Sequence, residues 1–366
     1  MVCEAGGWWA VAIVATGLAV GCERGTLDKQ PPDGRLSADG GIVLSGSGAP
    51  GVPGGAGGVN TNGRATGSDG MPVIPACVVS SRAPDDWSEA IAPGEIRGSR
   101  VTDAWAAPGR DNLFFAVVSP PTGDPPIASV QIARWTAGCW TADLRWSTSS
   151  ASAPSLAGSA GDDIWATVGD AVLHRDATSW TRADGQLRTL LAAQHPGVAP
   201  SFDAVRVGES GVWVMGGRFV WHHDPRGWRM FEVSDEQIVG AAYPTPGTIR
   251  FTALRPDRAG VVLGGAIDFV GGAILEAAFV CRYDGNTWTP TVVGRGRVTA
   301  LESDGAGGLW IGALSGGGNP SLWHLDGAGA LAGIPIEGWP LFAETQALWA
   351  GSVDDIWAAS GSALAH

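Results

Sequence analysis

Six side chains that could ligate a metal or carry a charge occupy matched positions of an internal repeat. They are Arg134, His174, His222, Arg282, His324 and His366. A ring of histidines suggests zinc, but Zn–N bonds are about 2.1 Å long, whereas equivalent positions of neighbouring repeat units lie many ångströms apart. His222 and His223 are adjacent on an expected strand and therefore point to opposite faces. We expect these residues to have a repeated structural role and predict no metal site.

Aspartates recur in the glycine-rich turns that come before the apolar strands of the repeat. They are Asp111, Asp162, Asp163, Asp257, Asp304, Asp354 and Asp355. Asp side chains stabilise such turns by accepting hydrogen bonds from nearby backbone N–H groups, and this explains them without a ligand. A calcium loop needs alternating oxygen ligands, which no single turn here provides. We predict no cofactor, with calcium at these turns as the alternative.

No motif of a common hydrolase or redox enzyme is present in the chain. The patterns G-x-S-x-G, H-E-x-x-H and C-x-x-C are all absent. This argues against the enzymes that use them, but an enzyme built from scattered residues is still open. We therefore assign no catalytic residues and expect a protein that binds rather than catalyses.

Two loops of the repeat are enlarged, at Ser119–Ser129 and Ala266–Ala277. Insertions on one face of a repeat array often mark its binding face. Loop variation without function is the alternative. The candidate ligand-binding residues are Asp124, Asp268, Phe269 and Glu276, with Arg206 and Arg250 on inner strands as candidate channel groups.

The repeat itself shows most clearly in a column of large apolar residues. They are Phe114, Trp165, Trp213, Val262, Trp310 and Trp357, separated by 51, 48, 49, 48 and 47 positions. Helical repeats of similar length need 3.6-residue patterning and few glycines, whereas this chain has 56 Gly. A period near 48 built from strands predicts an all-β fold, a six-bladed β-propeller over residues 77–366. Seven blades with a truncated end is the alternative.

The fifth repeat illustrates the four strands expected in each blade. We predict them at Arg297–Ser303, Leu309–Ala313, Ser321–Leu325 and near Leu331–Ile336. The sixth repeat stops at His366, before its outer strand. A segment at Trp87 resembles the openings of other outer strands, so we expect it to complete the last blade and remove the exposed edge.

Some copies of the repeat resemble known families. Gly308-Leu309-Trp310-Ile311-Gly312, followed by Leu322-Trp323-His324-Leu325-Asp326-Gly327, is similar to repeats of two-component-regulator propellers, and the period is close to that of WD and kelch repeats. Asp163-Ile164-Trp165-Ala166 and Asp355-Ile356-Trp357-Ala358 resemble repeats of myxobacterial lipoproteins. The resemblance covers residues 85–366. It implies a propeller fold and specifies no chemistry.

The first residues read as an export signal. The apolar run Trp8–Val20 is shorter than the roughly 20 residues that a membrane-spanning helix needs. Its end, Leu18-Ala19-Val20-Gly21-Cys22, resembles a bacterial lipobox, which implies cleavage after Gly21 and lipidation, such as palmitate attachment, at Cys22. Ordinary cleavage is the alternative, and the start Met1-Val2-Cys3-Glu4 lacks the usual positive charge. Residues 22–76 form a Gly-, Pro- and Ser-rich tether with a reach of about 40 Å.

Composition and cysteine content narrow the class of partner. The chain has 23 Lys and Arg against 36 Asp and Glu, a net charge of -13, so nucleic acid is not an expected partner. In the expected propeller Cys77 and Cys139 lie near one rim of adjacent blades, which predicts a disulfide in an oxidising compartment. Cys281 falls mid-strand and is expected in the core.

Together these features predict a monomeric lipoprotein, anchored in the cell envelope, that binds an envelope protein or a glycan. The alternative is a polysaccharide hydrolase or lyase that acts through the central mouth of the propeller. Converging carboxylates at that mouth would favour the enzyme.

Overall fold

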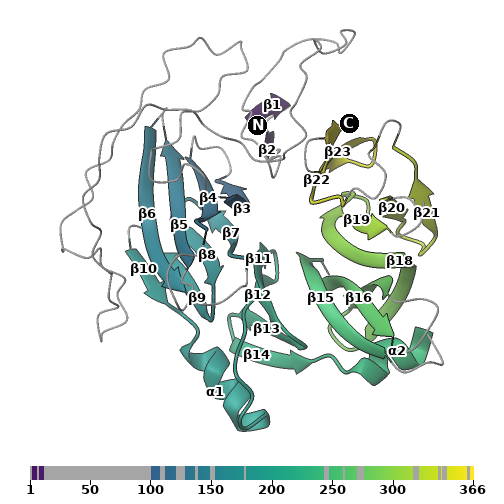
Figure 1. The fold of residues 1–366 in the computed structure, drawn as a ribbon, viewed down its shortest axis with the longest axis horizontal. Helices are drawn as coiled ribbons and strands as arrows, with labels where there is room; N and C mark the ends of the chain where they lie inside the picture. The colour runs from purple at the N-terminus through teal and green to yellow at the C-terminus, as the bar shows by residue number, and fades with distance from the viewer. Residues whose placement is uncertain are drawn as a thin grey trace.

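The structure of the protein is a computed structural model. It describes residues 2–5, 8–11, 100–107, 112–120, 128–136, 139–148, 153–176, 179–242, 247–258, 260–269, 276–315, 321–336, 339, 344–360 and 363–366. The prediction of an all-β fold is confirmed for this part of the chain, which is a succession of antiparallel sheets with two short helices (Figure 1). Neither helix is long and apolar enough to cross a membrane.

The first three units are four-stranded meanders. Unit one comprises β3 (Arg100–Ala106), β4 (Asn112–Val118), β5 (Ala128–Thr136) and β6 (Cys139–Thr148). Unit two comprises β7 (Ser155–Ala160), β8 (Asp163–Val168), β9 (Ala171–Asp176) and β10 (Ser179–Arg182). Unit three comprises β11 (Ala204–Gly208), β12 (Gly211–Gly216), β13 (Phe219–Asp224) and β14 (Gly227–Glu232).

Units four and five share one long strand. Unit four comprises β15 (Gly247–Pro256), β16 (Val261–Phe269), β17 (Glu276–Tyr283) and the first half of β18 (Trp288–Ser303). The second half of β18 begins unit five, with β19 (Leu309–Ser315), β20 (Leu322–Leu325) and β21 (Leu331–Ile334). The strand changes partner from β17 to β19 at Gly296, whose positive φ of 102° suits glycine. The predicted strands of this fifth repeat are confirmed.

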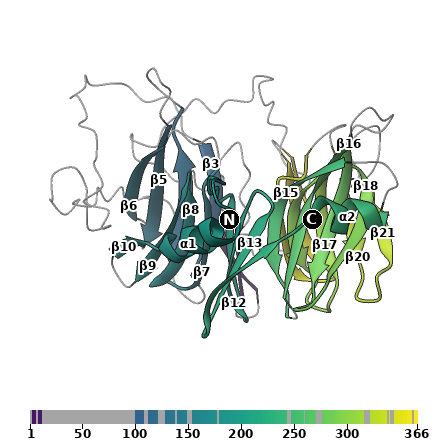
Figure 2. The same ribbon diagram turned by 90° about the horizontal axis from the view of Figure 1, so that it is seen from below.

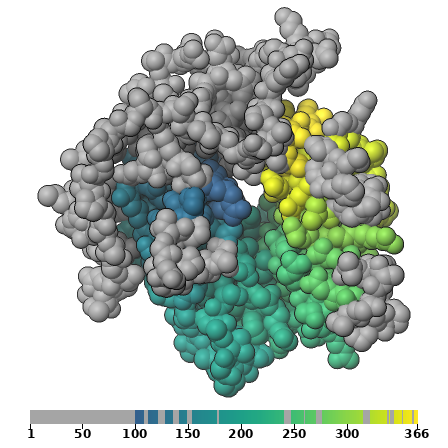
Figure 3. All heavy atoms as spheres, in the orientation of Figure 1, coloured from purple at the N-terminus to yellow at the C-terminus, as the bar shows by residue number. Residues whose placement is uncertain are grey.

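Unit six has three described strands: β22 (Ala347–Ser352), β23 (Asp355–Ser360) and β24 (Ala363–Ala365). A separate hairpin, β1 (Val2–Ala5) and β2 (Trp8–Val11), lies at the start of the chain. The units succeed one another along an arc, so that unit one and unit six border the same side of the molecule (Figure 1). The space-filling view has an opening between these two ends of the series (Figure 3).

The core lies between successive sheets rather than inside one of them. Four buried apolar clusters join units three and four, one and two, two and three, and four and five. The second strand of a unit is covered on both faces, which is why β12 reads as the unbroken apolar run Val212-Trp213-Val214-Met215. Burial between sheets therefore requires each unit to have a neighbour, as expected for a repeat fold.

Two helices depart from the purely β prediction, and Figure 2 shows them from below. Helix α1 (Gly185–Gln194) connects units two and three and buries Leu187 and Leu191, one turn apart. Helix α2 (Asp235–Ala242) connects units three and four. Ser234 and Gln237 cap α2 reciprocally, because each side-chain oxygen accepts a hydrogen bond from the other residue's backbone N–H. This Ser-x-x-Gln pattern is a helix-start signal that was present in the sequence.

Inner strands of neighbouring units are also joined by threonine hydroxyls at strand bulges. Thr252 of β15 donates to the carbonyl oxygen of Val298 in β18, and Thr299 of β18 donates to that of Thr345. Thr102 of β3 makes the equivalent bond to Pro154, at 3.0 Å. A bulge frees one side chain from the regular alternation of the strand, and here that side chain links one unit to the next.

Candidate functional site

The two columns found in the sequence are opposite halves of one cross-strand contact. In units one to five each member of the apolar column pairs with the His or Arg of the same unit, as in Trp165 with His174 and Trp310 with His324. In unit six the rings of Trp357 and His366 are in contact. The Trp and His rings stack in unit two, with centroids 4.2 Å apart and planes 20° apart, and are tilted by 35° in unit five, with centroids 4.4 Å apart. This is what a repeated structural role predicts.

The turn aspartates complete these contacts. The Nε2 atom of His174 lies 2.8 Å from Asp163, that of His324 3.0 Å from Asp304, and that of His366 2.9 Å from Asp355. In unit four Arg282 takes the place of His and lies 3.2 Å from Asp257.

Backbone hydrogen bonds hold Asp304 in its turn. Asp304 also accepts hydrogen bonds from the backbone N–H groups of Ala306 and Gly308. Burial on its own would raise the pKa of Asp304, but the bonds from His324 and these two N–H groups outweigh it and lower the pKa. Among the described residues no group of three or more His, Cys, Asp or Glu could hold a metal ion.

A groove of about 320 Å³ lies where units three and four meet, at the end of the sheets where their inner strands begin. Unit three and the segment before it contribute Asp203, Gly217 and Arg218, and α2 contributes Asp235. Unit four contributes Thr248, Ile249, Arg250, Phe251 and Asp268. The groove is therefore built from residues of both units and from the helix between them.

Three residues singled out in the sequence meet at one side of this groove. Arg250 lies 2.7 Å from Glu276 and 3.5 Å from Asp268. The expectation that Asp268, Phe269 and Glu276 belong to an enlarged loop was wrong in its local structure. Asp268 and Phe269 end β16, and Glu276 begins β17 and pairs with Asp268 across the strands. The insertion lengthens the strands, because the additional residues continue the ladder, and this brings the carboxylates beside Arg250.

Backbone contacts fix the other charged groups of the groove. Asp235 accepts a hydrogen bond of 2.9 Å from the N–H of Ile249, and Asp203 accepts one of 3.0 Å from Gly217. Gly217 has a φ of 59° in the turn between β12 and β13, a conformation that other residues rarely adopt, and this turn positions Arg218. Sequence reasoning missed Asp203, Asp235, Arg218 and Thr248. The one signal for any of them was the capping pattern that precedes α2, which includes Asp235.

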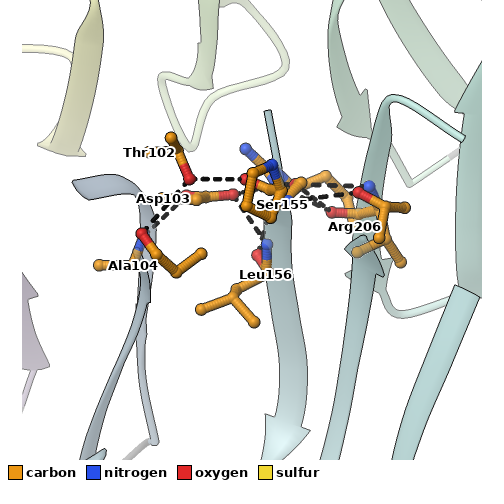
Figure 4. A network of polar contacts seen from close by, with 10 residues as sticks. Thr102, Asp103, Ala104, Ser155, Leu156 and Arg206 are labelled. Atoms are coloured by element: carbon orange, nitrogen blue, oxygen red, sulfur yellow. Dashed lines mark hydrogen bonds and ion pairs between the residues drawn. The ribbon is translucent and has the colours of Figure 1, made fainter. Parts of the chain in front are cut away.

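Arg206 does not line this groove and belongs to a second polar network (Figure 4). Its Nη1 atom lies 3.0 Å from Asp103 and 2.6 Å from the hydroxyl of Ser155. Asp103 also accepts a hydrogen bond of 2.9 Å from the N–H of Leu156. The network thus connects the inner strands β3, β7 and β11 of three successive units.

A second inner-strand ion pair links units four and five. Arg255 of β15 lies 2.6 Å from Glu302 of β18. Arg206, Arg255 and Glu302 occupy equivalent register positions, each opposite the apolar column of its own unit. Burial raises the pKa of Glu302, and the nearby charges of Arg255 and Arg206 only partly oppose this effect.

The remaining predicted site residues lie elsewhere or outside the described residues. Cys22, Gly21, Cys77 and Asp124 fall in segments that the structure does not describe. Cys139 begins β6, and its pairing with Cys77 stays a prediction. Cys281 lies in β17 and is fully buried, as predicted, and desolvation raises the pKa of its thiol to about 12.

Comparison with known proteins supports the class of fold and shows no family. No family model matches the sequence, and no curated protein is similar to it. One solved structure that is similar to this chain is the extracellular domain of a protein described as a one-component system, BT4673 of B. thetaiotaomicron. It matches with a TM-score of 0.50 and 12% identity over 75% of this chain, and the match spans about a third, 34%, of that chain. A hypothetical protein from Leishmania major has a TM-score of 0.29 at 10% identity, covering 67% of this chain and 89% of its own. The first match supports a β-rich repeat fold.

Proposed function

We propose that the protein is a non-catalytic binding scaffold of the cell envelope, lipid-anchored through Cys22, which receives a protein or glycan partner at the groove between units three and four. The observation that carries this proposal is the lining of that groove. Charged side chains from two units and their connecting helix are held around one hollow by hydrogen bonds and ion pairs. Few, well-positioned polar groups are typical of binding sites.

The body of the scaffold is, in this proposal, a six-bladed β-propeller. Support comes from the succession of meanders, from the apolar clusters that join units one to five, and from inner strands that meet through Arg206. In the described residues β24 pairs only with β23, which leaves an edge for a further strand. The segment at Trp87, outside the described residues, is the proposed partner that closes the ring.

The lining carboxylates favour binding over catalysis. Asp235 is bonded to a backbone N–H, and Asp268 and Glu276 are bound by Arg250, so these groups are fixed acceptors. The alternative, a polysaccharide hydrolase or lyase, draws support from Glu302, because a buried carboxyl group with a raised pKa suits a general acid. However, both oxygens of Glu302 already bind Arg255.

The test is capture of a partner from envelope extract with the full-length chain. We expect one or more partners to be retained by the wild-type protein and by the control Asp354→Asn, an exposed turn residue at the opposite end of the sheets. The Arg250→Ala variant lacks the group that holds Asp268 and Glu276, and it should fail to retain these partners. Release of sugar from envelope polysaccharide by the wild-type protein would instead favour the enzyme.

The proposed lipid anchor in the cell envelope is tested separately. Lipidation predicts that cells supplied with a labelled fatty acid transfer the label to the wild-type chain and not to Cys22→Ser. A labelled Cys22→Ser protein, or an unlabelled wild-type protein found in the membrane fraction, would refute anchoring at this residue.

A further inference from the structure

The groove between units three and four has a negative charge balance. Its lining has three aspartates, Asp203, Asp235 and Asp268, and two arginines, Arg218 and Arg250. Each arginine has a glutamate partner beside the groove: Glu232 lies 3.4 Å from Arg218, and Glu276 lies 2.7 Å from Arg250. Five carboxylates thus face two guanidinium groups, a formal charge of -3.

The negative charge of the groove has the same sign as the net charge of the whole chain, so both repel anionic ligands and attract cationic ones. The net charge of the sequence is -13, so acidic polymers are repelled both by the groove and by the protein as a whole. The imidazole of His195 lies 3.5 Å from Glu232 and would cancel at most one negative charge when protonated. The groove therefore selects for a cationic ligand.

The arrangement of the carboxylates suits an organic cation better than a metal ion. They do not form a group of three that could hold a metal, among the residues that the structure describes. Instead they come from the segment before β11, from α2 and from the end of β16. Ammonium or guanidinium groups can each bind one carboxylate of a dispersed set.

The apolar part of the lining indicates which organic cation fits. Phe251 is 6% exposed and belongs to the core between units three and four, but Ile249 is only half-buried and leaves apolar surface alongside the three aspartates. Lysine and arginine bury an aliphatic stem against such surface while the charged head reaches a polar partner. An amino sugar carries its amine on a compact ring covered with hydroxyl groups and has no such stem.

We infer that the occupant of this groove is a lysine- or arginine-bearing segment of a partner protein. The inference rests on the proposed binding function and names the class of ligand. The stem of a long cationic side chain lies over Ile249, and cationic heads bind Asp235 and Asp268. Binding weakens as salt rises, because the groove is open and exposed charges are screened beyond about 8 Å at physiological ionic strength.

The experiment uses the full-length chain and the probe peptides Gly-Lys-Gly-Lys-Gly and Gly-Glu-Gly-Glu-Gly, with binding followed by ligand-observed NMR at low and physiological ionic strength. We expect the lysine peptide to bind and the glutamate peptide not to bind. Asp235→Asn and Asp268→Asn keep the shape of the side chain, and each should weaken binding by about two- to fivefold, the range for an exposed ion pair. Asp354→Asn should leave it unchanged.

Other outcomes overturn the inference. These are equal binding of both peptides, no binding of the lysine peptide, or unchanged binding in the Asp235→Asn, Asp268→Asn double variant. Chitosan oligosaccharides or Ca²⁺ binding at the groove in place of the lysine peptide would also overturn it. In each of these cases the proposed function is still supported if the wild-type protein captures a partner from envelope extract and Arg250→Ala does not. Failure of the ligand class is therefore distinguishable from failure of the binding function.

Discussion

Trp213 on β12 and His222 on β13 lie directly opposite each other, with ring centroids 3.9 Å apart and ring planes 10° apart. The Nε2 atom of His222 lies 2.9 Å from the carbonyl oxygen of Ser210 in the preceding turn. Trp357 and His366 of unit six repeat the stack, at 4.4 Å and 24°. One contact therefore ties the second strand, the third strand and the first turn of a unit together, and its recurrence in units two, three, five and six accounts for the tryptophans and histidines of the two sequence columns.

Trp213→Ala should be among the most destabilising single substitutions. The side chain is 2% exposed and joins the core between units three and four, so its loss removes a large buried area and leaves a cavity. We expect the free energy of unfolding to fall by about 3–5 kcal/mol, measured by urea denaturation. Trp357→Ala, at a half-buried position, is the comparison and should cost less. Equal losses would show that the stack, rather than burial, sets the cost.

Asp304→Asn should change how stability depends on pH. The pKa of Asp304 is lowered in the folded protein, so its carboxylate stabilises the fold above the ordinary pKa of 3.8 and this contribution is lost as pH falls through the lower folded value. The variant should be less stable at neutral pH and should lose less stability below about pH 4. Urea denaturation across that range checks this. A parallel pH dependence in both proteins would contradict the assignment.

Thr252→Val should loosen the contact between units four and five. Valine keeps the shape of threonine but cannot donate to the carbonyl oxygen of Val298, a fully buried residue. We expect a loss of about 0.5–1.5 kcal/mol in the free energy of unfolding. Thr189→Val is the matched control, because the hydroxyl of Thr189 bonds to Gly185 within the exposed face of α1. A larger loss at Thr189 would argue against an inter-unit role.

Cys281 should resist alkylation until the protein unfolds. Its thiol is fully buried and its pKa is raised to about 12, so the reactive thiolate is scarce at pH 8. Iodoacetamide treatment followed by peptide mass mapping should find the Cys281 peptide unmodified in buffer and modified in denaturant. Modification in buffer would place the thiol at the surface.

The amides of β24 test the proposed closure of the ring. If the segment at Trp87 pairs with β24, the outward N–H groups of β24 should exchange slowly with deuterium. Deletion of residues 78–99 should then make these groups exchange fast. Leu364 in the middle of β24 is 38% exposed, so the side chain alone does not protect the strand. Fast exchange in the intact chain would contradict closure.

Periodic features of this protein could be predicted from the sequence, because they depend on local pattern. The spacing of the apolar column predicted a recurring antiparallel unit, and turn residues around Leu309 and Leu322 predicted strands of the fifth repeat. The mid-strand position of Cys281 gave its burial. Helix α2 also had a local signal in the sequence, the capping pair Ser234 and Gln237. The helix was not predicted from it, because the strand periodicity dominated the interpretation.

The tertiary structure alone decided which charged groups meet. Arg250 and Glu276 are 26 positions apart, and Arg206 and Asp103 are 103 positions apart. These contacts depend on how far strands β15 to β17 extend and on how neighbouring inner strands converge, and neither leaves a pattern in the sequence. The sequence by itself therefore determined the repeating unit, since burial between sheets demands regular spacing. Only the packing of unlike units determined the groove, because each unit supplies just part of its lining.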